Sequence, residues 1–95
     1  MKYTKQEVMD QICVLLGIST WRVSTGSTEP KGFLLEVASA IGLNVVSSET
    51  KTALAKMIVE AGGGTWLPTH ESQGATITLS GLEAIELSVR KLLEM

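Results

Sequence analysis

The chain has 95 residues, of which 44% are hydrophobic and 19% charged, and it carries a formal net charge of -2. This length allows one domain, residues 1–95, and the composition excludes a disordered or fibrous chain. The acidic balance argues against binding nucleic acid by bulk electrostatics, and apolar runs as short as 12–16 exclude a membrane span. We therefore expect a cytoplasmic protein that has no membrane partner.

The first predicted helix begins at Thr4 and stops near Gly17. The Thr4 hydroxyl and the Glu7 carboxylate have the spacing of a capping box, and glycine commonly ends a helix. Cys13 lies within an apolar run, where a lone thiol behaves as a small buried hydrophobe. The apolar face of this helix comprises Val8, Ile12, Leu15 and Leu16.

The second predicted helix begins after Thr28 and ends at Gly42. Pro30 fits its first turn, where the missing amide proton does no harm. The segment 43–49 follows as a hinge to the second half of the chain.

The third helix is predicted from about Thr50 to Ala61, because the glycines at 62–64 cannot continue it. The alternation of polar and apolar residues at 76–79 predicts a short strand that pairs with residues 66–67. Residues 70–74 would form the tip of this hairpin, or wing. The fourth helix is predicted to start at Ser80, with Glu83 completing a second capping box.

Several short motifs recur in the same order in both halves of the chain. We infer a duplication, and predict a mainly α fold of two pseudo-symmetric helix-loop-helix repeats, 4–43 and 50–93, with the short β-hairpin or wing in the second repeat. Each helical hairpin would bury its apolar face against the other. Chance agreement between two ordinary helical hairpins is the alternative. The matched pairs are Thr4-Lys5 with Thr50-Lys51, Gly17 with Gly63, Thr20-Trp21 with Thr65-Trp66, Ser24 with Ser72, Gly26 with Gly74, and Thr28 with Thr76.

Each half also carries glycine among hydroxyl residues in its loop, at 24–28 and at 72–76. Open amides at a helix start, with hydroxyls beside them, favour a phosphate or a carboxylate. The first loop is the better candidate, because it leads directly into a helix and has Arg22 and Lys31 nearby. Plain helix capping and turn formation is the alternative reading.

The two tryptophans, Trp21 and Trp66, would stack on bases, anchor a protein partner, or fill the space between helices. His70 is the only histidine and lies in a polar loop, which argues against an ordinary zinc site. Cys13 is expected to be buried, which disfavours its thiolate and hence a Cys/His catalytic pair. We therefore expect neither enzyme activity nor a cofactor or metal.

A set of short motifs lies within residues 20–93: Gly26-Ser27-Thr28-Glu29-Pro30-Lys31, residues 33–38, Thr50-Lys51 at a helix start, Trp66, Ser72-x-Gly74 and residues 76–82. Together these motifs resemble a small helical accessory DNA-recognition domain attached to bacterial restriction endonucleases. This resemblance implies a role in restriction-modification or defence, although the chain has no cleavage domain.

Two functional hypotheses follow. The first is a non-catalytic DNA-binding module that reads sequence or base modification, in which phosphate contacts position the module and base contacts give specificity. The second is a protein-protein interaction module, either a homodimer or a phage or bacterial regulator that docks on a larger partner. The nucleic-acid-binding candidates are Trp21, Arg22, Ser24, Ser27, Thr28, Lys31, Trp66, His70, Ser72 and Thr76.

Overall fold

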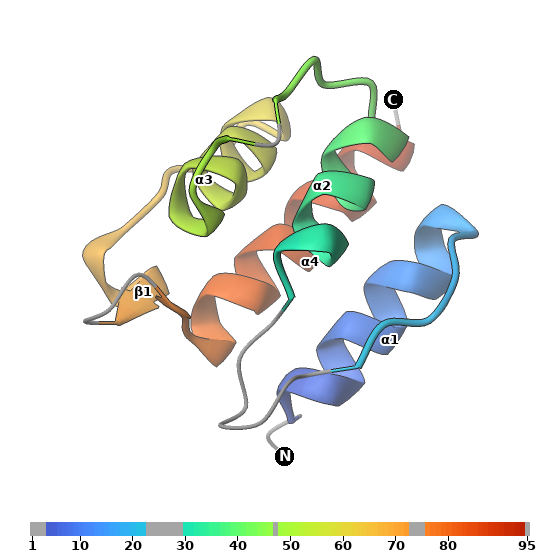
Figure 1. Cartoon of the computed structure of the whole chain (residues 1–95), viewed down its shortest axis with the longest axis horizontal. Coiled ribbons are helices and arrows are strands. Elements are labelled where there is room, and N and C mark those ends of the chain that lie inside the picture. Colours follow the sequence, from blue (N-terminus) through green and yellow to red (C-terminus); the bar gives the residue numbers. More distant parts are fainter. Residues whose placement is uncertain (1–3, 23–29, 47, 73–75, 95) are drawn as a thin grey trace.

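The computed structural model describes residues 4–22, 30–46, 48–72 and 76–94. These residues form a mainly α domain with four α-helices, as the sequence predicted (Figure 1). The helices are α1 (Lys5–Leu16), α2 (Lys31–Ala40), α3 (Lys51–Ala61) and α4 (Leu79–Leu93). A 3-10 turn, Pro68–His70, and two short strands, β1 (Glu71–Ser72) and β2 (Thr76–Ile77), lie between α3 and α4.

The predicted starts of α1 and α3 are confirmed. The Thr4 hydroxyl accepts a hydrogen bond from the Glu7 amide, and the Glu7 carboxylate accepts one from the Thr4 amide, which completes the capping box. The Thr50 hydroxyl caps α3 by accepting a hydrogen bond from the Ala53 amide. Each hydroxyl thus satisfies one of the amides that a helix leaves unpaired at its start.

The ends of α1, α2 and α3 share one backbone arrangement. Gly17, Gly42 and Gly63 have φ values of 68°, 86° and 85°, a left-handed conformation that favours glycine. At each end two nested backbone hydrogen bonds close the last turn, as in a Schellman motif. Gly17 and Gly63, which the sequence pairs across its two halves, therefore have the same conformation and the same role.

The starts of α2 and α4 differ from the prediction. Pro30 is the N-cap of α2 and adopts an extended backbone, so it precedes the first turn instead of lying in it. Helix α4 begins at Leu79 with Thr78 as its N-cap, so the capping box predicted at Ser80 and Glu83 is wrong. The Thr78 hydroxyl accepts a hydrogen bond from the Gly81 amide and donates one to the Thr69 carbonyl. These bonds fix the N-cap two residues before the predicted Ser80.

The predicted hairpin is shorter and paired differently. The antiparallel strands β1 and β2 pair Glu71 with Ile77 and Ser72 with Thr76, over two residues each. Residues 66–67 do not pair with 76–79, because the chain turns at Pro68–His70 before it reaches β2. Residues 73–74, predicted at the tip, lie outside the described residues.

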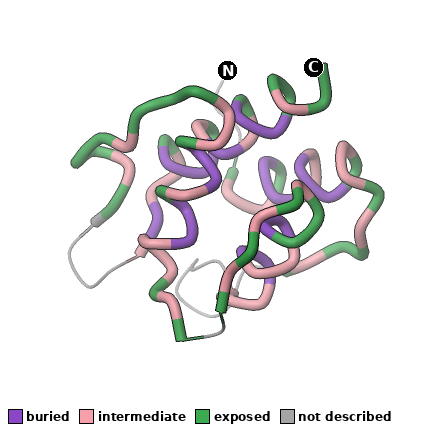
Figure 2. Tube along the Cα trace, turned by 90° about the horizontal axis from the view of Figure 1, so that it is seen from above, coloured by how far each residue is buried: buried purple, intermediate pink, exposed green. Residues whose placement is uncertain are grey.

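The core is a single cluster to which all four helices and β2 contribute (Figure 2). Helix α4 packs against both α1 and α3, whereas α2 packs chiefly against α3. Cys13 is buried, as predicted. The largest fully buried side chains are Phe33, Met9, Ile12, Leu34, Leu54, Ile58, Ile77, Leu82, Ile85, Val8 and Val37.

The helices α1, α2 and α4 run in the same direction, from lower left to upper right in Figure 1. After Gly17 the chain returns along α1. The side-chain amide of Gln6, in the first turn of α1, donates a hydrogen bond of 2.7 Å to the Trp21 carbonyl. Six extended residues span about 20 Å, which matches the length of a twelve-residue helix. The helical hairpins predicted from the sequence are therefore wrong in direction, because the chain returns before the next helix begins.

No helix in the described part of the chain has both the length and the hydrophobicity needed to cross a bilayer.

Candidate functional site

The segment Trp21-Arg22 is fixed beside the first turns of α1 and α2. The Trp21 indole N–H donates to a Glu36 carboxylate oxygen on α2 at 2.6 Å. Its six-membered ring lies against Gly32, where a Cβ would come within 2.7 Å of the ring. With Gln6 holding the Trp21 carbonyl, the backbone that carries Arg22 is attached to both helices. The Arg22 side chain is exposed.

The start of α2 lies beside this segment and lacks a side-chain cap. Pro30 has no side chain that accepts a hydrogen bond from the first turn. Lys31 is the first residue of the helix and is half-buried. The structure thus places Arg22 and Lys31 near the same helix start. The remaining residues of the first loop predicted to bind phosphate, Ser24, Ser27 and Thr28, lie outside the described residues.

Trp66 and His70 support the turn that precedes β1. The His70 Nδ1 accepts a hydrogen bond of 3.1 Å from the Leu67 amide, and its ring centroid lies 5.0 Å from that of Trp66. The Trp66 indole N–H donates to Glu71 at 3.3 Å. Both side chains are half-buried, so they hold the turn together and offer only part of their surface to a ligand.

Ser72 and Thr76, the last two predicted candidates, are paired backbone positions of the antiparallel strands β1 and β2. Thr76 is half-buried. The backbone pairing brings these positions together, as expected for neighbouring parts of one loop.

The two tryptophans have different surroundings. Trp21 lies between α1 and α2 and donates to a carboxylate 15 residues further along the chain. Trp66 donates to a carboxylate only five residues away and contacts His70. The position of Trp21 agrees with the interpretation that it fills the space between two helices. Trp66 instead belongs to the turn before β1.

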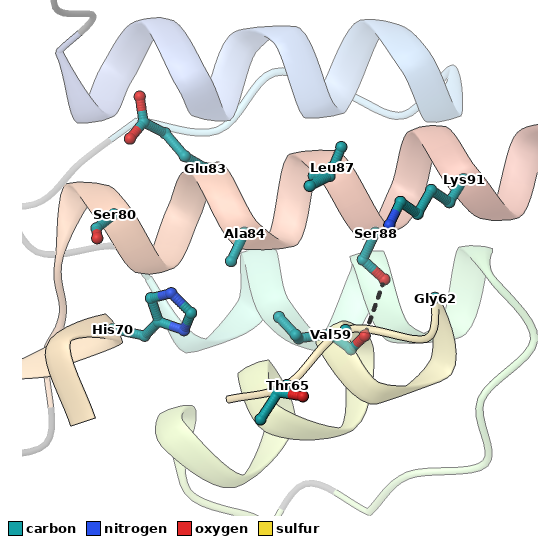
Figure 3. Close-up of a pocket in the computed structure, with 11 residues that line it drawn as sticks. Val59, Gly62, Thr65, His70, Ser80, Glu83, Ala84, Leu87, Ser88 and Lys91 are labelled. Carbon is teal, nitrogen blue, oxygen red and sulfur yellow. Dashed lines mark hydrogen bonds between the residues drawn. The ribbon is translucent and has the colours of Figure 1, made fainter. Parts of the chain in front are cut away.

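A groove of about 350 Å³ lies along α4, beside the end of α3 (Figure 3). Within the groove Gly62 lies close against Ser88, and the Ser88 hydroxyl donates a hydrogen bond to the Ile58 carbonyl at 2.6 Å. No sequence pattern indicates this groove, since its walls come from segments far apart in the chain. The groove is lined by Val59, Gly62, Gly64, Thr65, His70, Ser80, Glu83, Ala84, Leu87, Ser88 and Lys91.

The buried thiol of Cys13 is unsuited to nucleophilic chemistry. Burial raises its pKa above 9.0, and the carboxylates of Asp10 and Glu36 raise it further against the lowering effect of a hydrogen bond from the Trp21 backbone. A protonated thiol is a poor nucleophile and a poor metal ligand. Among the described residues, no three His, Cys, Asp or Glu side chains are grouped closely enough to hold a metal ion.

Comparisons with protein-family models, with curated proteins and with solved structures gave no match to this chain.

Proposed function

We propose that the chain is a non-catalytic DNA-binding module, and that its contact surface is the end of the molecule at which α1, α2 and α4 begin. The observation that carries this proposal is the common direction of these helices (Figure 1). Each helix start bears a partial positive charge, so helices that begin at one end together favour an anion there. A phosphate backbone is the anion that such a module would bind.

Arg22 and Lys31 have separate roles in this proposal. Lys31 and the start of α2 hold a backbone phosphate, together with Ser24, Ser27 and Thr28. Arg22 projects from the anchored Trp21 segment toward the bases, where its guanidinium can donate two hydrogen bonds to one base edge. Trp66, His70, Ser72 and Thr76 form the flank of this surface.

The resemblance to accessory domains of restriction endonucleases supports a role in recognising sequence or base modification in a defence context. Such a role does not require a strongly basic chain, because a few positioned contacts can give specificity. The net charge of -2 predicts weak binding to DNA that lacks the recognised feature.

The test is a titration with duplex and single-stranded oligonucleotides, with and without methylated bases, at two salt concentrations. We expect binding at low salt that is weakened in an Arg22→Ala, Lys31→Ala double variant. A Lys56→Ala, Arg90→Ala variant is the matched control, because it removes the same charge from α3 and from the far half of α4. No binding at low salt, or equal losses in both variants, would contradict the proposal.

We also infer that the two halves arose by duplication, as two pseudo-symmetric repeats. The equivalent Schellman ends at Gly17 and Gly63 support this inference, as do the threonine caps at Thr4 and Thr50. The different partners of Trp21 and Trp66 imply that the copies have since diverged.

A second candidate function is protein docking, and the groove along α4 is the observation that favours it. Leu87 is 54% exposed at the groove, next to Ala84 and Ser88. A partner side chain that enters the hollow beside this leucine would remove apolar surface from water on both molecules. A Leu87→Glu variant that folds normally should then lose the partner in a binding assay.

A further inference from the structure

The outer face of α4 places one exposed leucine midway between two opposite charges. Glu83 lies four residues before Leu87 and Lys91 lies four residues after it, and all three side chains are exposed. At 1.5 Å per residue, each charged residue is about 6 Å along the helix axis from the leucine. The three residues share one face of the helix and line the same groove (Figure 3).

We propose that a second copy of this chain occupies the groove, with the two α4 helices packed antiparallel about a twofold axis at Leu87. Antiparallel packing centred on residue 87 sets Glu83 of each copy opposite Lys91 of the other. The leucines meet at the axis and fill the space above Ala84 and Ser88. This inference rests on the second proposed function, protein docking, and names its partner.

The charge pattern selects both the partner and the orientation. A twofold interface uses the same surface on both copies, so that surface must be complementary to itself. The sequence of negative, apolar and positive residues is complementary to its own reverse. Parallel packing would instead place Glu83 against Glu83 and Lys91 against Lys91, which is repulsive.

Surface hollows flank α4 on both sides. A stable interface buries about 800 Å² on each partner, so the second copy must contact more than Glu83, Leu87 and Lys91. A second shallow hollow joins the groove at Glu83 and Leu87 and is bounded by Gln11, Glu86 and Arg90. The second copy would therefore contact α1 and the glycine segment after α3 as well as α4.

Charge reversal tests the pairing in the full chain. Sedimentation equilibrium should show a concentration-dependent dimer for the native protein. Glu83→Lys alone and Lys91→Glu alone should each weaken dimerisation by at least about tenfold, because each creates two like-charge contacts. The double variant, with both charges reversed, should restore the dimer. A monomeric native protein, or a double variant no better than the single ones, would overturn the proposal.

A cysteine placed at the axis gives an independent test. Leu87→Cys should form a disulfide-linked dimer on mild oxidation, because the proposal brings the two residues 87 together at the axis. The native Cys13 is buried and should not compete for the disulfide. Val46→Cys is the matched control: Val46 is 59% exposed, close to the 54% of Leu87, but it lies in the connection between α2 and α3 and lines neither hollow beside α4. Equal crosslinking at both positions would indicate random collisions and would overturn the proposal.

The same variants separate this inference from the function on which it rests. If the native protein is monomeric but Leu87→Glu abolishes binding to another protein, self-association is wrong and protein docking stands. If Leu87→Glu changes neither the self-association of this chain nor its binding to another protein, both self-association and protein docking at the groove are wrong. DNA binding is tested at Arg22 and Lys31, which do not line the groove, so that test is separate from these results.

Discussion

A side chain at position 62 would collide with α4. A Cβ built on Gly62 meets the Ser88 hydroxyl at 2.1 Å and the Ser88 Cα at 2.8 Å, both shorter than any normal contact. Glycine is therefore required here by close packing, whereas at Gly63 it is favoured by the left-handed φ of 85°.

Substitutions at these two glycines should separate the two causes. We expect Gly62→Ala to lower the free energy of unfolding by about 1–3 kcal/mol through overpacking, and Gly62→Asn to lower it further. At Gly63, Asn should be tolerated better than Ala, since asparagine adopts the left-handed conformation more readily. Urea unfolding of the four variants would rank the Ala and Asn variants at each position. The same ranking at both positions would contradict different causes for the two glycines, close packing at 62 and left-handed φ at 63.

The two tryptophans should differ in their contribution to stability. Trp21→Phe removes a 2.6 Å hydrogen bond to a carboxylate in a half-buried site, which we expect to cost about 1.5–3 kcal/mol. Trp66→Phe removes a longer and exposed hydrogen bond of 3.3 Å, and should cost less than about 1 kcal/mol. Thermal and urea unfolding of both variants would show whether the predicted difference holds.

The thiol of Cys13 predicts a loss of stability at alkaline pH. Its pKa is raised in the folded chain, so the folded state keeps the proton at a pH where the unfolded chain loses it. The free energy of unfolding should therefore be constant well below pH 9.0 and fall above it, by up to about 1.4 kcal/mol per pH unit. Cys13→Ala should lack this component in urea unfolding measured between pH 7 and pH 10. Equal pH dependence in both proteins would contradict it.

At the scale of the element, the start of α4 depends on Thr78. Its hydroxyl accepts a hydrogen bond from the Gly81 amide at 3.1 Å and donates one to the Thr69 carbonyl at 2.8 Å. This residue therefore joins the helix to the turn before β1, whereas Thr50 only caps its own helix.

Thr78→Ala should consequently be more harmful than Thr50→Ala. We expect losses of about 2 kcal/mol and about 1 kcal/mol in the free energy of unfolding. Thr78→Ser keeps both hydrogen bonds and should be close to the native protein. Circular dichroism during urea unfolding would measure all three, and equal losses for the two alanine variants would argue against the joint role of Thr78.

At the scale of the whole molecule, the proposed DNA surface lies where α1, α2 and α4 begin and has few charged contacts to phosphate. DNA binding should therefore depend only weakly on salt concentration. With one charged contact to phosphate, from Lys31, the slope of log K against log salt should be about -0.9. Lys31→Ala should remove most of this slope, whereas Arg22→Ala should weaken binding with little change in slope. Fluorescence anisotropy at several salt concentrations measures these slopes. A slope steeper than about -4 would mean that a broader basic surface makes the contact.

The sequence by itself determined the local parts of this protein. The cap at Thr4, the helix start at about Thr50, the glycine ends of the helices and the burial of Cys13 follow from residue types within a few positions of each, and all were predicted correctly. The start of α4 was misplaced because the choice of Thr78 over Ser80 depends on the Thr69 carbonyl, which the turn at Pro68–His70 brings close.

Only the tertiary structure decided the direction of the helices and the location of the groove. Periodic apolar residues show which face of a helix is buried, but they are equally compatible with antiparallel or parallel neighbours. The direction depends on whether each connection returns along a helix, as Gly17 to Arg22 does, and hence on the contacts of Trp21 with Gln6 and Glu36. The groove depends on Gly62 meeting Ser88, residues 26 positions apart that no local pattern connects.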